Sequence, residues 1–316
     1  MSIKAGSLFR LFVSVALIAF VLSRAELAVV GETIVSADPF FILLAFLSFF
    51  VSNACSVARW QIMLAAHGTK PGFGYLYSSF MIGVFFNQIL PTTVGGDVAR
   101  YHYTSGVGRG KAFSAVFMDR VFGVVSLAMF AFAGLVFTRR FSVVPDRIIE
   151  PVALLLALGV VAITVIFLLP QAQFERIRRL YRLLPAKLAN FVDKTFSAFA
   201  AYRGRRDVVF AALGLSLLLQ CVVVTHFFLI SQALDLEVPF YAYVYIVPVA
   251  VIIMMLPISI NGIGVRESVF ALLLGAHGAG TSETLAFSWI SYGLILVHGL
   301  VGGIVFAVVR RTRSTS

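Results

Sequence analysis

Two arginines occur beside proline and glycine in the middle of long apolar stretches, and both belong to one repeated pattern. Residues 90–100 read LPTTVGGDVAR and residues 256–266 read LPISINGIGVR, so proline, glycine and arginine recur with the spacing P-x4-G-x3-R. A cation and a helix break are both costly in lipid unless they are buried in protein or line a wet cavity. The pattern therefore predicts helix breaks at Pro91 and Pro257 that together build one polar site, as in a membrane transporter.

The chemistry expected at these breaks is anion binding. A short helix should follow each break, and the unpaired N–H groups and positive dipole end at its N-terminus favour an anion. The planar guanidinium of arginine suits phosphate oxygens, and glycine lets a headgroup approach the backbone closely. We therefore predict a site for a phosphate or lipid headgroup. Its candidate residues are Arg100, Arg266, Gly95, Gly96, Gly262, Gly264, Asn87 and Asn261.

The same charged residues allow an internal alternative, in which they only hold the breaks in place. Arg100 would then pair with Asp97, and Arg266 would pair with Glu267 or Asp119. Neighbouring residues on a helix do not face each other, so the adjacent acid and base at 119–120 should have different partners. Two roles stay open for the charged residues at these positions: a structural clamp, or a group that couples transport to protons. The candidates for coupling or for ion pairs are Asp97, Asp119, Arg120 and Glu267.

Other polar side chains within apolar segments have simpler interpretations. His226 and His298 each predict a hydrogen bond between helices. Arg59 and Trp60 together read as an anchor at the membrane interface. Four uncharged side chains flank the breaks, where they can satisfy freed backbone groups or contact a headgroup: Asn87, Gln88, Ser259 and Asn261.

The composition is that of a polytopic membrane protein. Hydrophobic residues make up 60% of the 316 residues and charged residues only 12%, so a soluble domain could not cover the apolar surface. The net charge of +11 comes from Lys and Arg in loops and termini, which indicates anionic lipid headgroups rather than nucleic acid as partners. Six segments are long enough, or nearly so, to span a bilayer: 8–23, 40–58, 112–137, 152–169, 208–232 and 284–309.

Motifs for enzymatic chemistry are absent from the sequence. It contains no HExxH, CxxC, P-loop or GxGxxG pattern, and its two cysteines, Cys55 and Cys221, lie inside predicted spans. We therefore expect no metal, no cofactor and no enzymatic activity.

Charge placement predicts the topology. The basic loop 171–207 and both termini should be cytoplasmic by the positive-inside rule. If residues 73–99 crossed the membrane once as an ordinary helix, the basic loop 171–207 would lie outside the cell. The conflict disappears if 73–99 and 240–277 are re-entrant helical hairpins that enter from opposite faces and turn at the two breaks.

The predicted fold is an all-α polytopic membrane protein with an inverted-topology repeat. It has about six full spans plus two re-entrant helical hairpins, arranged as a single membrane domain over 1–316. Residues 1–150 form the first half of the repeat and residues 151–316 form the second, inverted half.

The motifs resemble one known family. The run Asn87–Arg100, the pair at 119–120 and the run Pro257–Glu267 are similar to the flippase-like family related to the transmembrane part of lysylphosphatidylglycerol synthases, the bacterial multiple peptide resistance factors. The resemblance covers nearly the whole chain. It implies a multi-pass protein of the inner (cytoplasmic) membrane that moves a polar lipid between leaflets. The synthases carry a large cytosolic transferase domain after the membrane part, and this chain stops seven residues past Val309, so the resemblance carries over only the translocation activity.

The expected function is therefore that of a lipid flippase for an anionic phospholipid or polyprenyl-type lipid. A small-solute or ion transporter on the same plan stays open as an alternative, as does an intramembrane lipid-modifying enzyme. The sequence also leaves open whether copies of the chain form a homo-oligomer.

Overall fold

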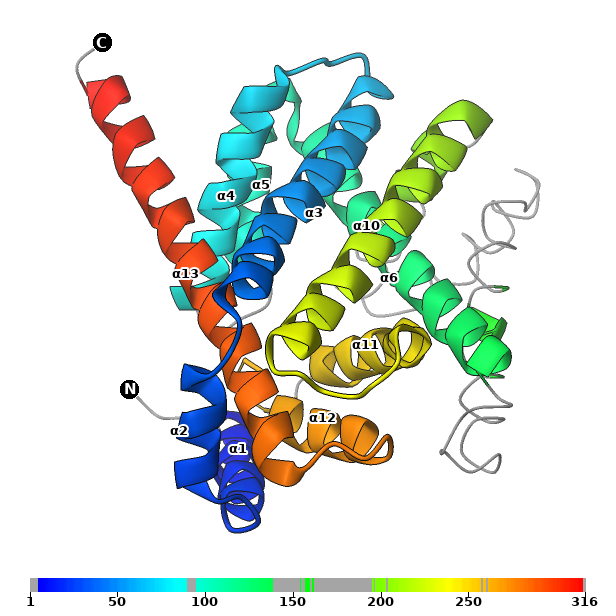
Figure 1. Ribbon diagram of the computed structural model, residues 1–316. Coiled ribbons are helices and arrows are strands. Elements are labelled where there is room, and N and C mark those ends of the chain that lie inside the picture. The colour runs from blue at the N-terminus through cyan, green and yellow to red at the C-terminus, as the bar shows by residue number, and fades with distance from the viewer. Residues whose placement is uncertain are drawn as a thin grey trace.

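The computed structural model describes residues 5–89, 95–138 and most of 195–314, together with a few positions between 154 and 161. Within 195–314, residues 196, 203, 257 and 260 lie outside the described residues. The elements in these ranges are helices (Figure 1). In chain order they are α1 (Ala5–Leu22), α2 (Leu27–Val35), α3 (Pro39–Ala65), α4 (Phe73–Ile89), α5 (Gly95–Thr104), the 3-10 turn η1 (Ser105–Val107), α6 (Arg109–Thr138), α10 (Arg206–Ala233), α11 (Phe240–Met255), α12 (Val265–Gly275) and α13 (Thr281–Ser314).

Four of these helices have the length and composition of membrane spans. They cover Pro39–Ala65, Gly110–Phe137, Arg206–Ala233 and Thr281–Val309, which confirms four of the six predicted spans as long apolar helices. The predicted span 8–23 is α1, and its apolar part bends by 85° into α2. The described residues thus contain four spans, or five if the bent pair crosses as one. The remaining predicted span, 152–169, lies almost entirely outside the described residues.

Local sequence explains where the first long span begins. Asp38 precedes α3 in extended conformation, and its side chain accepts a hydrogen bond from the N–H of Phe40 (2.8 Å). Pro39 takes the first helical position, where its missing N–H costs nothing. This start fixes the register of α3, which carries several of the site residues described below.

The first predicted hairpin is formed by α4 and α5. Asn87, near the end of α4, accepts a hydrogen bond from the N–H of Gly96 at the start of α5 (2.6 Å). Tyr75, near the start of α4, donates to the carbonyl of Tyr103 at the end of α5 (2.7 Å). Contacts at both ends mean that the chain runs back along itself, so the predicted interruption of this segment is confirmed. The turn itself, with Pro91, lies outside the described residues.

The second predicted hairpin is formed by α11 and α12. Tyr245 in α11 is hydrogen-bonded to Nε2 of His277, just beyond α12 (2.6 Å), so these two helices also run back along each other. Between them the backbone adopts positive φ at Asn261 (51°), Gly262 (77°) and Gly264 (82°). A continuous helix cannot pass through such a run. The break is confirmed, and Pro257 lies outside the described residues.

Small residues allow the hairpins to pack closely against the spans. At Gly302 of α13, a Cβ atom would collide with the backbone carbonyl of Met81 in α4. At Gly134 of α6, it would lie 2.8 Å from the carbonyl of Val244 in α11. Close approach of backbones through glycine is the usual means of helix association in membranes. Each hairpin is therefore seated against one long helix.

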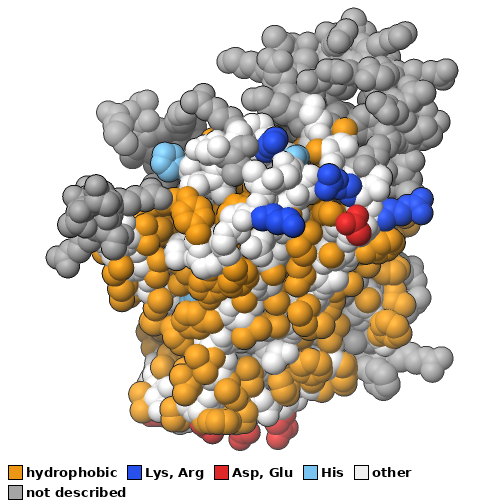
Figure 2. Space-filling view, turned by 90° about the horizontal axis from the view of Figure 1, so that it is seen from above, with side chains coloured by type: hydrophobic (Ala, Val, Ile, Leu, Met, Phe, Trp, Pro, Cys, Tyr) orange, Lys and Arg blue, Asp and Glu red, His pale blue; other side chains and the backbone are white. Residues whose placement is uncertain are grey.

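The helices form two groups connected by long spans (Figure 1). α3 and α10 lie side by side in the middle, and α13 runs from the group of α1, α2 and α12 to α4, against which it packs. The face in Figure 2 carries a broad hydrophobic band, with Lys and Arg and one acidic side chain along one edge and other Asp and Glu along the opposite edge. The chain is thus an all-helical, multi-pass membrane protein. Its division into two inverted halves stays a prediction.

Candidate functional site

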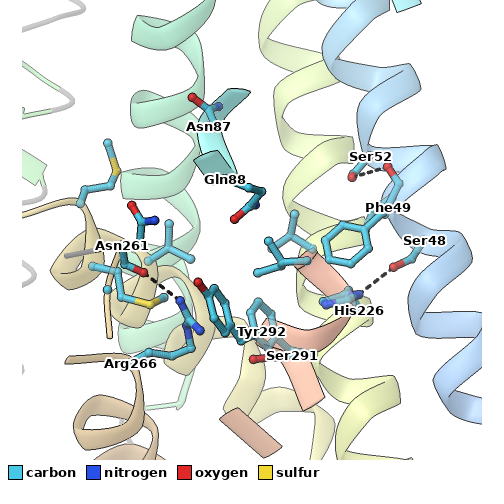
Figure 3. A pocket seen from close by; sticks show the side chains of 18 of the residues that line it. Ser48, Phe49, Ser52, Asn87, Gln88, His226, Asn261, Arg266, Ser291 and Tyr292 are labelled. Atoms are coloured by element: carbon cyan, nitrogen blue, oxygen red, sulfur yellow. Dashed lines mark hydrogen bonds between the residues drawn. The ribbon is translucent and has the colours of Figure 1, made fainter. Parts of the chain in front are cut away.

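A cavity of about 660 Å³ lies between the two hairpins and the central spans (Figure 3). α3, α4, α10, α11, α12 and α13 all contribute to its wall. Asn87 and Gln88 reach it from the end of α4, and Asn261, Gly262 and Arg266 reach it from the second break. The structure therefore brings residues of both predicted breaks to one site. This was the expectation drawn from the repeated pattern.

Arg266 is the cation of this cavity. Its side chain is almost entirely buried (6% exposed), and its guanidinium lies over the ring of Tyr292, 4.3 Å from the ring centroid. Nη2 donates to the backbone carbonyl of Asn261 (3.0 Å), whereas Nη1 has no hydrogen-bond partner within the described part of the chain. A buried cation with an unused donor in a cavity is prepared to receive an anion.

The carboxylate of the next residue in the sequence is engaged elsewhere. Glu267 is buried, and its Oε2 accepts a hydrogen bond from the N–H of Gly264 (2.7 Å), which caps the start of α12. Arg266 forms no ion pair among the residues that the structure describes. The internal alternative, in which Arg266 pairs with Glu267 or Asp119, therefore does not describe this arginine.

Arg100 has the opposite environment. Its Nη2 is 2.9 Å from Oδ2 of Asp119, and its Nη1 is 3.7 Å from Oδ1 of Asp97. The guanidinium also lies over the rings of Trp60 (4.4 Å) and Phe80 (5.1 Å). The ion pair expected in the internal alternative is present here, because Arg100 contacts the predicted partner Asp97 and a second acid, Asp119. Arg100 is not among the described residues that line the cavity.

Asp119 and Arg120 face different partners, as predicted. Asp119 is buried between Arg59 and Arg100, whereas Arg120 pairs with Asp97 through its Nε. The five side chains form one ion-pair network that ties α3, α5 and α6 together. The expected contact of Asp119 with the second arm of the hairpin is present through Arg100, and its role as a clamp stays a prediction.

The interpretation of Arg59 and Trp60 as an interfacial anchor is wrong. Arg59 is only 5% exposed and Trp60 is fully buried. Arg59 donates from Nε to Asp119 (2.6 Å) and from Nη1 to the hydroxyl of Ser216 in α10 (2.7 Å). An arginine directly after a predicted span, together with a lone acid within another predicted span, was the signal for this pair, because ionisable groups at membrane depth require partners.

The helix tips carry their own caps. At the first tip, the N–H of Gly96 is taken by Asn87, and a Cβ on Gly96 would lie 2.8 Å from the carbonyl of Gly83. Gly95 is also buried. At the second tip, Gly264 lies against the backbone of Ser14 in α1. The close backbone approach predicted at these glycines is therefore made by the protein itself, and only Gly262 faces the cavity.

Two histidines make the predicted contacts between helices. His226 of α10 lies 3.0 Å from the hydroxyl of Ser48 in α3, and His298 of α13 lies 2.7 Å from the side-chain nitrogen of Asn53 in α3. Phe49 packs between the two imidazole rings. His226 also lines the cavity, which the sequence did not predict.

The cavity wall is amphipathic. Its polar members are amides and hydroxyls besides Arg266 and His226, and the remainder is aliphatic, aromatic or methionine. Met255 and Leu256 line it and are also half exposed, so the cavity reaches the apolar surface at the second break. A ligand that combines an anionic headgroup with an apolar body matches such a wall.

These features define a class: a multi-pass helical membrane protein with an amphipathic cavity between two helical hairpins. The sequence matches the model of the lysylphosphatidylglycerol synthase TM region over residues 7–303, and the chain belongs to that family. Membership associates the chain with a function related to membrane lipids. It also confirms the resemblance drawn from the motifs.

Similar proteins include several UPF0104 membrane proteins. Two UPF0104 membrane proteins of Methanothermobacter thermautotrophicus are 22% and 21% identical; the matches cover 81% and 93% of this chain and 81% and 92% of those relatives. A UPF0104 membrane protein of Methanocaldococcus jannaschii is 28% identical over 33% of this chain, and that match spans only 34% of the relative. No solved structure gives a significant match.

Proposed function

We propose that this protein moves an anionic phospholipid or polyprenyl-type lipid between the leaflets of the cytoplasmic membrane. The headgroup phosphate binds Arg266 in the central cavity, while the apolar part of the lipid stays at the exposed edge near Met255 and Leu256. The observation that carries the proposal is the Arg266 guanidinium, buried in the cavity with one nitrogen unpartnered and no paired carboxylate among the described residues.

The position of this arginine supports transport rather than static binding. It follows a helix break with three positive-φ residues, and transporters commonly build their substrate sites at breaks of this kind. The end of the first hairpin contributes Asn87 and Gln88 to the same cavity. Movement of one hairpin relative to the other would open the cavity first to one leaflet and then to the other.

The proposal includes an orientation and an energy source. Both termini lie in the cytoplasm, in agreement with the positive-inside rule and with the separation of basic and acidic side chains in Figure 2. The sequence has no ATP-binding motif, so transport is downhill or coupled to the membrane potential or a proton. No covalent step is part of the proposal, and the protein acts as a transporter rather than an enzyme.

Transport can be measured in proteoliposomes that contain fluorescently labelled phosphatidylglycerol. Addition of a membrane-impermeant quencher reports how much label reaches the outer leaflet over time. We expect wild-type protein to accelerate this movement, and Arg266→Ala to slow it by roughly tenfold or more. A charge-assisted hydrogen bond is worth about 1.5–3 kcal/mol, and 1.4 kcal/mol corresponds to a factor of ten.

Arg24→Ala is the matched control, because Arg24 is an exposed arginine whose contact is with the ring of Phe20. It should leave transport unchanged. If the lipid does not cross but a soluble ion does, the chain is an ion transporter instead. Covalent change of the lipid recovered from the vesicles would indicate an enzyme.

A further inference from the structure

The cavity contains a second buried group without a partner. His226 is 4% exposed and lines the cavity, and its Nε2 has no hydrogen-bond partner within the described residues. Figure 3 places it on the α3–α10 side, across from Arg266. A buried polar atom left unsatisfied is costly, so a ligand group is expected to complete it.

The hydrogen bonds of the ring define what Nε2 can do. Nδ1 of His226 lies 2.8 Å from the backbone carbonyl of Ala45, which can only accept, and 3.0 Å from the hydroxyl of Ser48, which already donates its hydrogen to that carbonyl. Nδ1 therefore carries the hydrogen. In a neutral imidazole the other nitrogen is then an acceptor. His226 thus presents a bare lone pair to the cavity and requires a donor from the ligand.

The charged side chains of the cavity wall restrict which chemical group of the ligand can be that donor. Arg266 is the single charged side chain among the described residues that line the cavity, and no carboxylate is among them. A phosphate is matched by Arg266, but a ligand ammonium would be buried without a countercharge, which is costly in a low-dielectric site. An uncharged hydroxyl donates to Nε2 without this cost. Neutral amides and hydroxyls complete the polar wall: Asn87, Gln88, Ser259, Asn261 and Ser291.

We propose that the cavity selects lipids with one phosphodiester charge and an uncharged, hydroxyl-bearing headgroup such as glycerol or a sugar, and that His226 is the positioning residue for the hydroxyl. This inference rests on the proposed function and specifies its substrate class. Lipids whose headgroup bears an ammonium are disfavoured substrates.

The test compares three labelled lipids with identical acyl chains in the same proteoliposome assay: phosphatidylglycerol, phosphatidic acid and phosphatidylethanolamine. Phosphatidylglycerol should cross fastest, phosphatidic acid more slowly because it lacks the headgroup hydroxyl, and phosphatidylethanolamine slowest. The advantage of phosphatidylglycerol over phosphatidic acid should be about three- to tenfold, as expected for one neutral hydrogen bond.

Two substitutions of His226 test the role of Nε2 as a hydrogen-bond acceptor. His226→Asn keeps a donor near the position of Nδ1 and removes the acceptor at Nε2, whereas His226→Gln places an amide near the position of Nε2. We expect the asparagine variant to lose the preference for phosphatidylglycerol over phosphatidic acid and the glutamine variant to retain most of it. Thermal unfolding of both variants checks that the helix contacts are intact.

The outcomes separate the two proposals. If lipids cross with Arg266 dependence but phosphatidylethanolamine keeps pace with phosphatidylglycerol, the headgroup selection is wrong and the transport function stands. An unchanged preference in His226→Asn would overturn the role of His226. If none of the three lipids crosses, the transport function fails and the selection fails with it. If both variants unfold, binding of soluble short-chain versions of the three lipids to wild-type protein decides, and equal affinities would overturn the selection.

Discussion

Two arginines at matching positions of one pattern have different roles because their neighbours differ. Arg100 follows an aspartate three residues earlier and lies near Asp119, so its charge is neutralised inside the protein. Arg266 is followed by a glutamate that caps its own helix, so its charge remains available. Spacing alone predicted two equal anion ligands. The partners of each arginine on other helices, which spacing does not reveal, made them unequal.

Removal of the charge of the Asp119 side chain should strongly lower the thermal stability of the protein. Asp119→Asn leaves Arg59 and Arg100 buried without the carboxylate that both contact. Breaking such a buried pair costs about 3–5 kcal/mol. We expect a large drop in the thermal unfolding midpoint of the detergent-solubilised protein. The unfolding is monitored by tryptophan fluorescence. Glu32→Gln, at an exposed acid, is the control, and a midpoint equal to that of wild type in Asp119→Asn would contradict the clamp.

At the scale of elements, the seating of α13 against α4 depends on one glycine. A Cβ at Gly302 meets the backbone carbonyl of Met81, which cannot rotate away, whereas a Cβ at Gly293 of the same helix meets no atom within 4 Å. Gly302→Ala should therefore destabilise the fold by about 1–3 kcal/mol. Gly293→Ala should be neutral or slightly stabilising, because alanine favours helix. Thermal unfolding of the pair measures the difference, and equal midpoints would show that α13 is not held this closely.

The junction between α3 and the segment before α10 should be sensitive to acid. His67 lies just beyond α3, hydrogen-bonded to Tyr202 (3.1 Å), and its backbone carbonyl accepts from the ammonium of Lys111. Burial, and then the charges of Lys111 and Arg205, lower the pKa of His67 below its ordinary value of 6.5. The unfolded chain then binds the proton more readily than the folded chain, so stability is lost as the pH falls below 6.5.

The measurement is the thermal midpoint from about pH 7.5 to about pH 5.5, the range in which histidine titrates. Wild-type protein should lose stability toward the acid end, and His67→Gln should lose less. His102→Gln, at an exposed histidine, should follow wild type. A steeper acid loss in His67→Gln than in wild type would reverse the assigned sign.

At the scale of the whole molecule, the sequence predicted what hydrophobicity and helix breakers decide. Long apolar runs gave four spans, and the turn residues near Gly96 and Gly262 marked both hairpins, because a helix in lipid can be interrupted only at such residues. The burial of Arg59, the caps at the helix tips and the position of His226 in the cavity depend on which helices become neighbours. That information lies in tertiary packing, which neither charge counts nor periodicity contain.

We expect a lipid phosphate to occupy the cavity at Arg266 and not the ion-pair network at Arg100. The direct measurement is an experimental structure of the protein in lipid nanodiscs made with phosphatidylglycerol. We predict phosphate density within hydrogen-bond distance of the Arg266 guanidinium, with acyl density leaving past Met255 and Leu256. A cavity filled only by water or side chains, with phosphate bound at Arg100 instead, would contradict it.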